Sequence, residues 1–258
     1  MQSTSQQNAP AGGEGNIASL SEVISANPNN ANAFNLRGTA YAQEGQLDEA
    51  LADLNRAIQI NPNFFQAYNN RAVVFTRLNR PQDALTDYDR ATAIAPDYQT
   101  AYVGRGKLHM AANRVPLALA DFNKALQLDS NDPVARFNRG LIYQAQGKHI
   151  QAEDDFTLAL GLRPETLEPH LARGKSLYAM GKYKAASDDL AFVVERDDKN
   201  FEAWTWLGFA HEKLGKRDEA VNAYRWALHV KPGHEPAEQG LQRLGAGRGS
   251  LWRRSGRR

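Results

Sequence analysis

Apolar and small residues recur every three or four positions along most of the chain, a pattern typical of amphipathic helices. The stretch FNRGLIYQAQGK, residues 137–148, is one example, with Gly147 standing where such a helix would end. The segments that begin at Phe34, Val103 and Leu171 have similar sequences. This recurrence predicts a chain built from repeated helical units.

The repeating unit is 34 residues long when Ala31 is taken as its position 1. Position 8 is Gly or Ala in all six copies, and position 24 is Leu, Phe or Tyr. Position 20 is Ala throughout: Ala50, Ala84, Ala118, Ala152, Ala186 and Ala220. Small residues at positions 8 and 20 predict two helices in close approach, because larger side chains would overpack the contact.

The ends of the predicted helices are marked by a second set of residues. Position 15 is Gly or Asn in every copy, which suits a backbone that enters the left-handed region after a helix. Position 32 is Pro in four copies, and Pro cannot continue a helix. Each unit is therefore predicted to be a hairpin with helix A at positions 2–14 and helix B at positions 18–30. One hairpin cannot bury its apolar face alone, so neighbours should stack.

This unit resembles the tetratricopeptide repeat (TPR), which implies an all-α, right-handed superhelical solenoid. The resemblance covers residues 31–234 as six repeats: 31–64, 65–98, 99–132, 133–166, 167–200 and 201–234. Residues 16–30 fit a half-repeat helix before them. Residues 235–245 predict a capping helix, with Leu241 and Leu244 covering the last repeat.

Charged residues recur inside the repeats at two linked positions. Position 7 is Arg and position 23 is Asp in the first five repeats, whereas the sixth has Leu207 and Ala223. Because both charges are present or absent together, we predict an ion pair within each repeat, the alternative being an Arg ladder that lines an anion-binding groove. The predicted pairs are Arg37–Asp53, Arg71–Asp87, Arg105–Asp121, Arg139–Asp155 and Arg173–Asp189.

The resemblance also implies where a partner binds, because helix A positions 2, 5, 9, 12 and 13 line the concave face of a TPR superhelix. The first two repeats place polar residues there, Asn35 and Asn69 among them. Later repeats place an apolar strip with two lysines: Val103, Lys107, Met110, Phe137, Leu141, Leu171, Lys175, Tyr178 and Phe209. Exposed apolar strips usually mark a binding site, so a peptide or helix of another protein is the expected partner. The alternative is that several of these residues bury against the next repeat.

The composition and the motifs present limit the kinds of catalytic and metal sites that the chain could form. The chain has no Cys, which excludes disulfides and thiolate chemistry, and its six His are scattered. It lacks a Gly-rich phosphate loop, a Ser nucleophile elbow and a His-Glu metal motif. We therefore expect no enzyme activity, no cofactor and no metal site.

The two ends differ from the repeats in composition. Residues 1–15 are rich in Ser, Gln, Asn, Ala, Pro and Gly, which predicts a disordered tether similar to the leader of NlpI-like bacterial TPR lipoproteins. That similarity implies a periplasmic, outer-membrane-associated adaptor, and a cytoplasmic protein is the alternative. Residues 246–258 predict a flexible basic tail that could hold an anionic membrane or nucleic acid. The rest of the chain is net negative, which argues against nucleic acid, and self-association is a further alternative.

Overall fold

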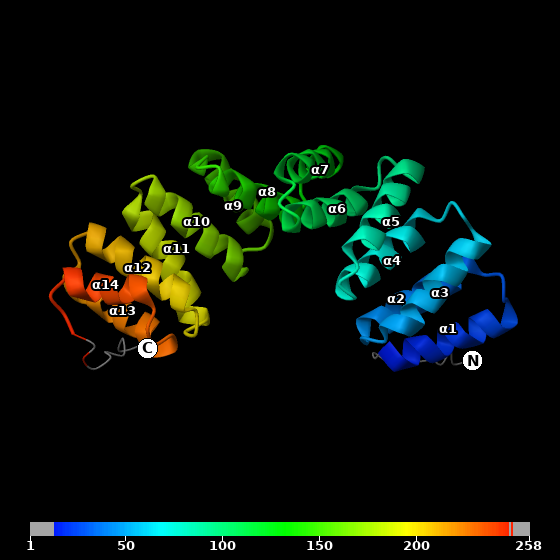
Figure 1. Ribbon diagram of the computed structural model, residues 1–258, viewed down its shortest axis with the longest axis horizontal. Helices are drawn as coiled ribbons and strands as arrows, with labels where there is room; N and C mark the ends of the chain where they lie inside the picture. Colours follow the sequence, from blue (N-terminus) through cyan, green and yellow to red (C-terminus); the bar gives the residue numbers. More distant parts are fainter. Residues whose placement is uncertain (1–12, 248, 250–258) are drawn as a thin grey trace, which may run out of the picture. The chain divides into compact units, whose positions relative to one another are not determined.

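The computed structural model describes residues 13–247 and 249. Residues 1–12 of the predicted tether and most of the basic tail lie outside these residues, whereas residues 13–15 of the predicted tether belong to the first helix. The chain divides between Ser130 and Asn131 into two compact units. Each unit is a stack of antiparallel helices, and the prediction of an all-α solenoid of TPR hairpins is confirmed (Figure 1).

The first unit contains a single helix followed by three hairpins. Within each hairpin the two helices pack against each other, and each hairpin also contacts the one beside it. The described helices are α1 (Gly13–Ala26), α2 (Ala31–Gln43), α3 (Leu47–Ile60), α4 (Phe65–Arg77), α5 (Pro81–Ile94), α6 (Gln99–Ala111) and α7 (Val115–Leu128).

The second unit contains three hairpins followed by a short helix that packs against the last of them. Its described helices are α8 (Pro133–Ala145), α9 (His149–Leu162), α10 (Leu167–Ala179), α11 (Tyr183–Arg196), α12 (Phe201–Lys213), α13 (Arg217–Val230) and α14 (Glu235–Arg243). Leu241 of α14 is buried in a cluster with Ala220, Tyr224 and Ala237, and Leu244 packs against that cluster.

The helices begin one position earlier than the repeat pattern predicts, at positions 1 and 17 of each unit. The turn between them has the expected left-handed residue at position 15 in all six hairpins. The φ angles are 84° at Gly45, 56° at Asn79, 55° at Asn113, 73° at Gly147, 76° at Gly181 and 71° at Gly215. The turn residue is therefore set by backbone conformation, since a Cβ placed at the position-15 glycines would meet no other atom within 4 Å.

We expect Gly147→Ala to lower the free energy of unfolding by roughly 1–2 kcal/mol, because a side chain in the left-handed region is strained. Gly161→Ala is the matched control, because Gly161 lies within α9 with ordinary helical φ and open space around it. That control should raise stability by about 0.5–1 kcal/mol. Urea denaturation of both variants checks this, and equal effects would contradict the turn argument.

The core of each hairpin is a contact between positions 8 and 24. A Cβ added to Gly140 would lie 2.6 Å from the Phe156 ring, and one added to Gly208 would lie 2.4 Å from the Tyr224 ring. Phe156 and Tyr224 are fully buried. The small residue at position 8 therefore allows helix A to approach the large side chain of helix B.

None of the described helices is both long and apolar enough to cross a membrane.

Candidate partner-binding site

The framework of the site is fixed by five charge pairs, one in each of the first five repeats. Each Arg sits on a helix A and donates two hydrogen bonds to the two carboxylate oxygens of an Asp on the following helix B. The Nε–Oδ2 distances are 2.7 Å for Arg37–Asp53, 2.7 Å for Arg71–Asp87, 3.0 Å for Arg105–Asp121, 2.8 Å for Arg139–Asp155 and 2.7 Å for Arg173–Asp189. All five Asp side chains are buried, and each guanidinium is engaged by the Asp of its own repeat, which argues against an anion-binding ladder.

The pairs also shift the pKa values of the five arginines and of Asp189. The hydrogen bonds to Asp87 raise the pKa of Arg71 above its ordinary value, and the other four arginines shift the same way. Burial alone would raise the pKa of Asp189, but hydrogen bonds from Arg173 and His170 outweigh burial and lower it. These pKa shifts favour the charged forms of the five arginines and of Asp189. In the sixth repeat Leu207 and Ala223 take these places in an apolar cluster.

In the first unit, three predicted groove residues are not available to a partner. Asn35 is 6% exposed, Asn69 4% and Val103 9%, so their expected role as contact residues must be corrected. Asn35 is buried by packing between consecutive helices A, where Asn70 Nδ2 on α4 donates to Asn35 Oδ1 on α2 at 2.9 Å. Asn69 Nδ2 donates to Asn70 Oδ1, its neighbour on α4, at 3.2 Å. α6, which carries Val103, packs against α4 in the same way. Lys107 on α6 is exposed and Met110 is half-buried.

In the second unit, the predicted residues of α8 also serve the contact between hairpins. Phe137 and Leu141 are half-buried and pack on a cluster that contains Phe156 and Ala172. The Phe137 and Phe156 rings lie 5.9 Å apart. Leu171 on α10 likewise packs on the core beneath it. These three residues thus pack against the core with part of their surface and leave only the rest for a partner.

Half-buried aromatic rings gather on the same side of α10 and α12. The Tyr178 ring centroid lies 5.4 Å from that of Trp206 and 6.2 Å from that of Phe209, and the Trp206 and Phe209 rings are 5.4 Å apart. The groove positions that the family resemblance implies do not include Trp206, because it occupies position 6. The signal for it was its size, since the other repeats have Leu, Asn, Gly, Asn and Ala there.

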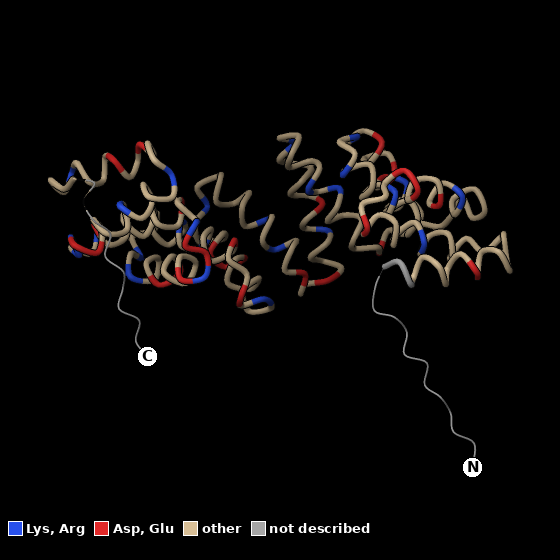
Figure 2. Tube along the Cα trace, turned by 90° about the horizontal axis from the view of Figure 1, so that it is seen from below, with Lys and Arg blue, Asp and Glu red and all other residues tan. Residues whose placement is uncertain are grey.

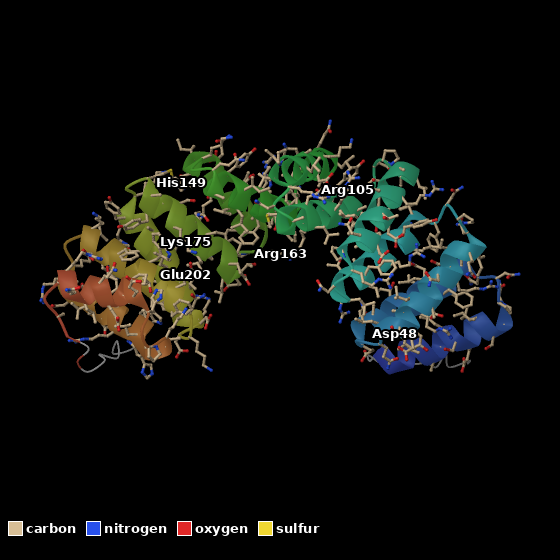
Figure 3. The ribbon with its side chains drawn as sticks, viewed as in Figure 1. Asp48, Arg105, His149, Arg163, Lys175 and Glu202 are labelled. Carbon is tan, nitrogen blue, oxygen red and sulfur yellow. The ribbon has the colours of Figure 1, made fainter. Side chains whose placement is uncertain are left out.

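Charge borders these rings. Lys175 on α10 contacts Glu202 on α12, with Nζ 2.5 Å from Oε1, and both side chains are seen on these neighbouring helices in Figure 3. We call Lys175, Tyr178, Trp206 and Phe209 the aromatic face. The guanidinium of Arg243 on α14 lies 5.8 Å from the Phe209 ring centroid and bonds to Glu212. The aromatic face thus combines apolar rings with a cation, and the carboxylates of Glu202 and Glu212 lie at its border. This composition is suited to holding a peptide.

Other chemistry finds no support in the described part of the chain. Within residues 13–247 and 249, no group of three His, Asp or Glu is arranged to hold a metal ion. Figure 2 shows Lys, Arg, Asp and Glu spread along the helices of both units.

Family models match much of the chain. A model described as TPR repeat matches residues 38–79. Two models described as Tetratricopeptide repeat match residues 61–99, 69–133 and 171–234, and residues 20–52 and 122–154, respectively. No catalytic family is found. No curated protein matches the sequence.

Solved structures with the same fold come from several settings. The chain is similar to PilF of Pseudomonas aeruginosa, with a TM-score of 0.74 and 22% identity over 83% of this chain and 97% of that one. It is similar to YrrB, described as a TPR protein with an unusual peptide-binding site, with a TM-score of 0.67 and 23% identity over 73% and 97% of the two chains. It also matches a chain of the APC/C hetero-tetramer Cut9-Hcn1, with a TM-score of 0.72 and 18% identity over 90% of this chain and 46% of that longer one.

Proposed function

Because this chain belongs to the tetratricopeptide repeat family, we propose that it is a non-catalytic scaffold that binds a segment of another protein on the aromatic face of its second unit. TPR proteins generally bind protein or peptide partners. The observation that carries the proposal is the cluster of Tyr178, Trp206 and Phe209 on the outer side of two consecutive helices A.

The packing of the unit supports a partner at these rings. The cores beneath α10 and α12 are already filled by buried residues such as Leu177, Leu190 and Leu207. Tyr178 and Trp206 pack against this core and Phe209 against the next cluster, yet all three stay only partly buried and so add apolar surface in contact with water. Trp and Tyr are enriched among the residues that dominate binding energy at protein interfaces.

The chemistry of the aromatic face indicates what the bound segment carries. Apolar or aromatic side chains would stack against the rings, as in other peptides that dock through a few anchors. The Lys175–Glu202 pair offers a donor and an acceptor on the border for polar groups of the segment. The peptide-binding site reported for YrrB, a protein of the same fold, is consistent with this use.

Capture of partner proteins from the cells that produce this protein tests the proposal. We expect Tyr178→Ala/Trp206→Ala to lose a partner that the wild type retains, because truncating central interface aromatics costs about 2 kcal/mol or more each. Ile150→Ala/Leu158→Ala removes exposed apolar side chains from α9 and should leave capture unchanged.

A destabilised variant distinguishes the effect of removing the aromatic side chains from the effect of lower stability. Leu177→Ala removes a buried side chain from α10 and lowers stability without changing the exposed rings. It should still capture the partner below its melting temperature. Equal capture by wild type and by the Tyr178→Ala/Trp206→Ala variant would remove the proposed site.

We also propose that the protein is located in the bacterial envelope. This location is supported by the composition of residues 1–15, which is typical of the spacer of a lipoprotein. Cell fractionation of the natural gene product tests it, with recovery in the membrane fraction expected and recovery in the cytosol alone contradicting it.

A further inference from the structure

The arginines at position 7 do more than pair within their own repeat. Arg71 Nη1 also donates to Asn55 Oδ1 on the preceding helix B at 2.6 Å, and Arg173 Nη1 donates to Thr157 Oγ1 at 3.2 Å. The arginines of repeats one and three reach the preceding helix B in the same way. The guanidinium therefore fills the space between two consecutive helices B.

The sixth repeat leaves that space open. The three corresponding positions hold Leu207, Ala223 and Ala191, which are too short to reach across it. A cleft of about 890 Å³ lies here between α11, α12 and α13, and these three residues line it. Trp204 and Trp226 form one wall, with their rings stacked at 5.5 Å and 14°. The lost ion pair is thus replaced by an apolar floor with an aromatic wall.

The residues around this floor are predominantly acidic. Lys184 and Lys216 are the basic residues in the lining, and Lys184 is bound to Asp188. The acidic lining residues are Asp188, Glu195, Asp198, Asp218 and Glu219. An occupant that fits has a large apolar side chain for the floor and positive charges beside it for the rim.

The chain itself contains such a segment. Residues 250–258, SLWRRSGRR, carry Trp252 next to two arginines, with two more following and no acid. They lie outside the described residues, but the chain just before them is placed. Ala246 and Gly247 line a small cavity together with Asp218 and Asn222 of α13, and both of those residues also line the cleft.

Residues 250–258 are long enough to extend from Gly249 to the cleft. Arg225 Nε donates to Gly247 O at 3.1 Å, so the described end of the chain lies against α13, which also lines the cleft. A helix with its side chains is about 10–12 Å across. Trp252 is three residues beyond Gly249, and each extended residue spans up to about 3.3–3.6 Å, so Trp252 can reach the cleft.

We propose that residues 250–258 dock into the cleft between α11, α12 and α13, with Trp252 on the apolar floor and its neighbouring arginines on the acidic rim. The segment then occupies the place that a guanidinium fills in the other repeats. This contact lies on the helix B side of the second unit and is independent of the aromatic face.

Disulfide trapping in the full-length chain tests this docking, because the protein has no Cys of its own. Ser255→Cys is combined with Glu219→Cys on the cleft rim, and in a control chain with Gln239→Cys on α14. Gln239 is exposed and much closer to Ser255 in sequence, so an undocked segment would meet it more often. We expect the Glu219 pair to form an intramolecular disulfide about tenfold faster or more.

Two further variants identify the contact. Trp252→Ala should remove most of the rate advantage of the Glu219 pair. Leu207→Arg/Ala223→Asp restores the charges used in the other repeats, fills the cleft, and should have the same effect. A faster Gln239 pair, disulfides formed mainly between two molecules, or rates unchanged by these variants would each overturn the proposal.

Discussion

Asp87→Ala is expected to lower the free energy of unfolding of the first unit by roughly 3–5 kcal/mol, because it leaves the guanidinium of Arg71 without its carboxylate in a largely buried place. The Asp87 side chain is 5% exposed and that of Arg71 19%. Both hydrogen bonds of the pair are 2.7 Å long, so the geometry is favourable before the change. Urea denaturation followed by circular dichroism measures the loss.

The double variant separates pairing from packing. Arg71→Leu/Asp87→Ala copies the residues that the sixth repeat has at these positions, Leu207 and Ala223, so it should recover part of the loss. Asp83→Ala on the same helix is the matched control, because its bridge to Arg80 joins two half-exposed side chains and contributes at most about 1 kcal/mol. A double variant no more stable than Asp87→Ala would contradict the pairing argument.

Phe156→Ala should be similarly damaging to the second unit, with a loss of roughly 3–5 kcal/mol. The ring is 0% exposed and fills the space beside Gly140, where a Cβ would come within 2.6 Å of it. Because Gly140 has no side chain to move into the cavity, helix A and helix B would lose their main contact. Denaturation of the second unit, followed by the near-ultraviolet signal of its tryptophans, reports this loss.

Phe156→Leu is the control for that prediction. Leu54 and Leu190 occupy the same position in two other repeats and are fully buried there. The variant should therefore cost about 1.5 kcal/mol or less. Equal losses for Ala and Leu would mean that the site does not tolerate the exchange that the repeats themselves display.

The framework was predictable because each part of it depends on a local rule. The left-handed turn at Asn79 or Gly147 follows from backbone sterics, and the small residue at Gly140 follows from its contact with Phe156. The Arg71–Asp87 pair could be inferred because both charges disappear together in the sixth repeat. Repetition supplied several comparisons within one chain, which a single motif cannot do.

The site was less predictable because it depends on how neighbouring hairpins fit. Position 5 is exposed in a single hairpin, yet Asn35 is buried where Asn70 of the next helix A donates to it, and Asn69 is buried beside Asn70 on α4. Trp206 enters the aromatic face only because Tyr178 on the preceding helix A lies beside it. The cleft under Leu207 likewise requires the spacing of helices B, which the sequence pattern alone does not contain.

The central claim is that the aromatic face holds a partner protein, and site-specific photo-crosslinking tests it most directly. A photoreactive amino acid placed at Tyr178 on α10 or at Leu158 on α9 is activated in cells, and the adducts are identified by mass spectrometry. Crosslinking of one partner segment from position 178 and not from position 158 is the predicted result. The same adducts from both positions, or from position 158 alone, would contradict it.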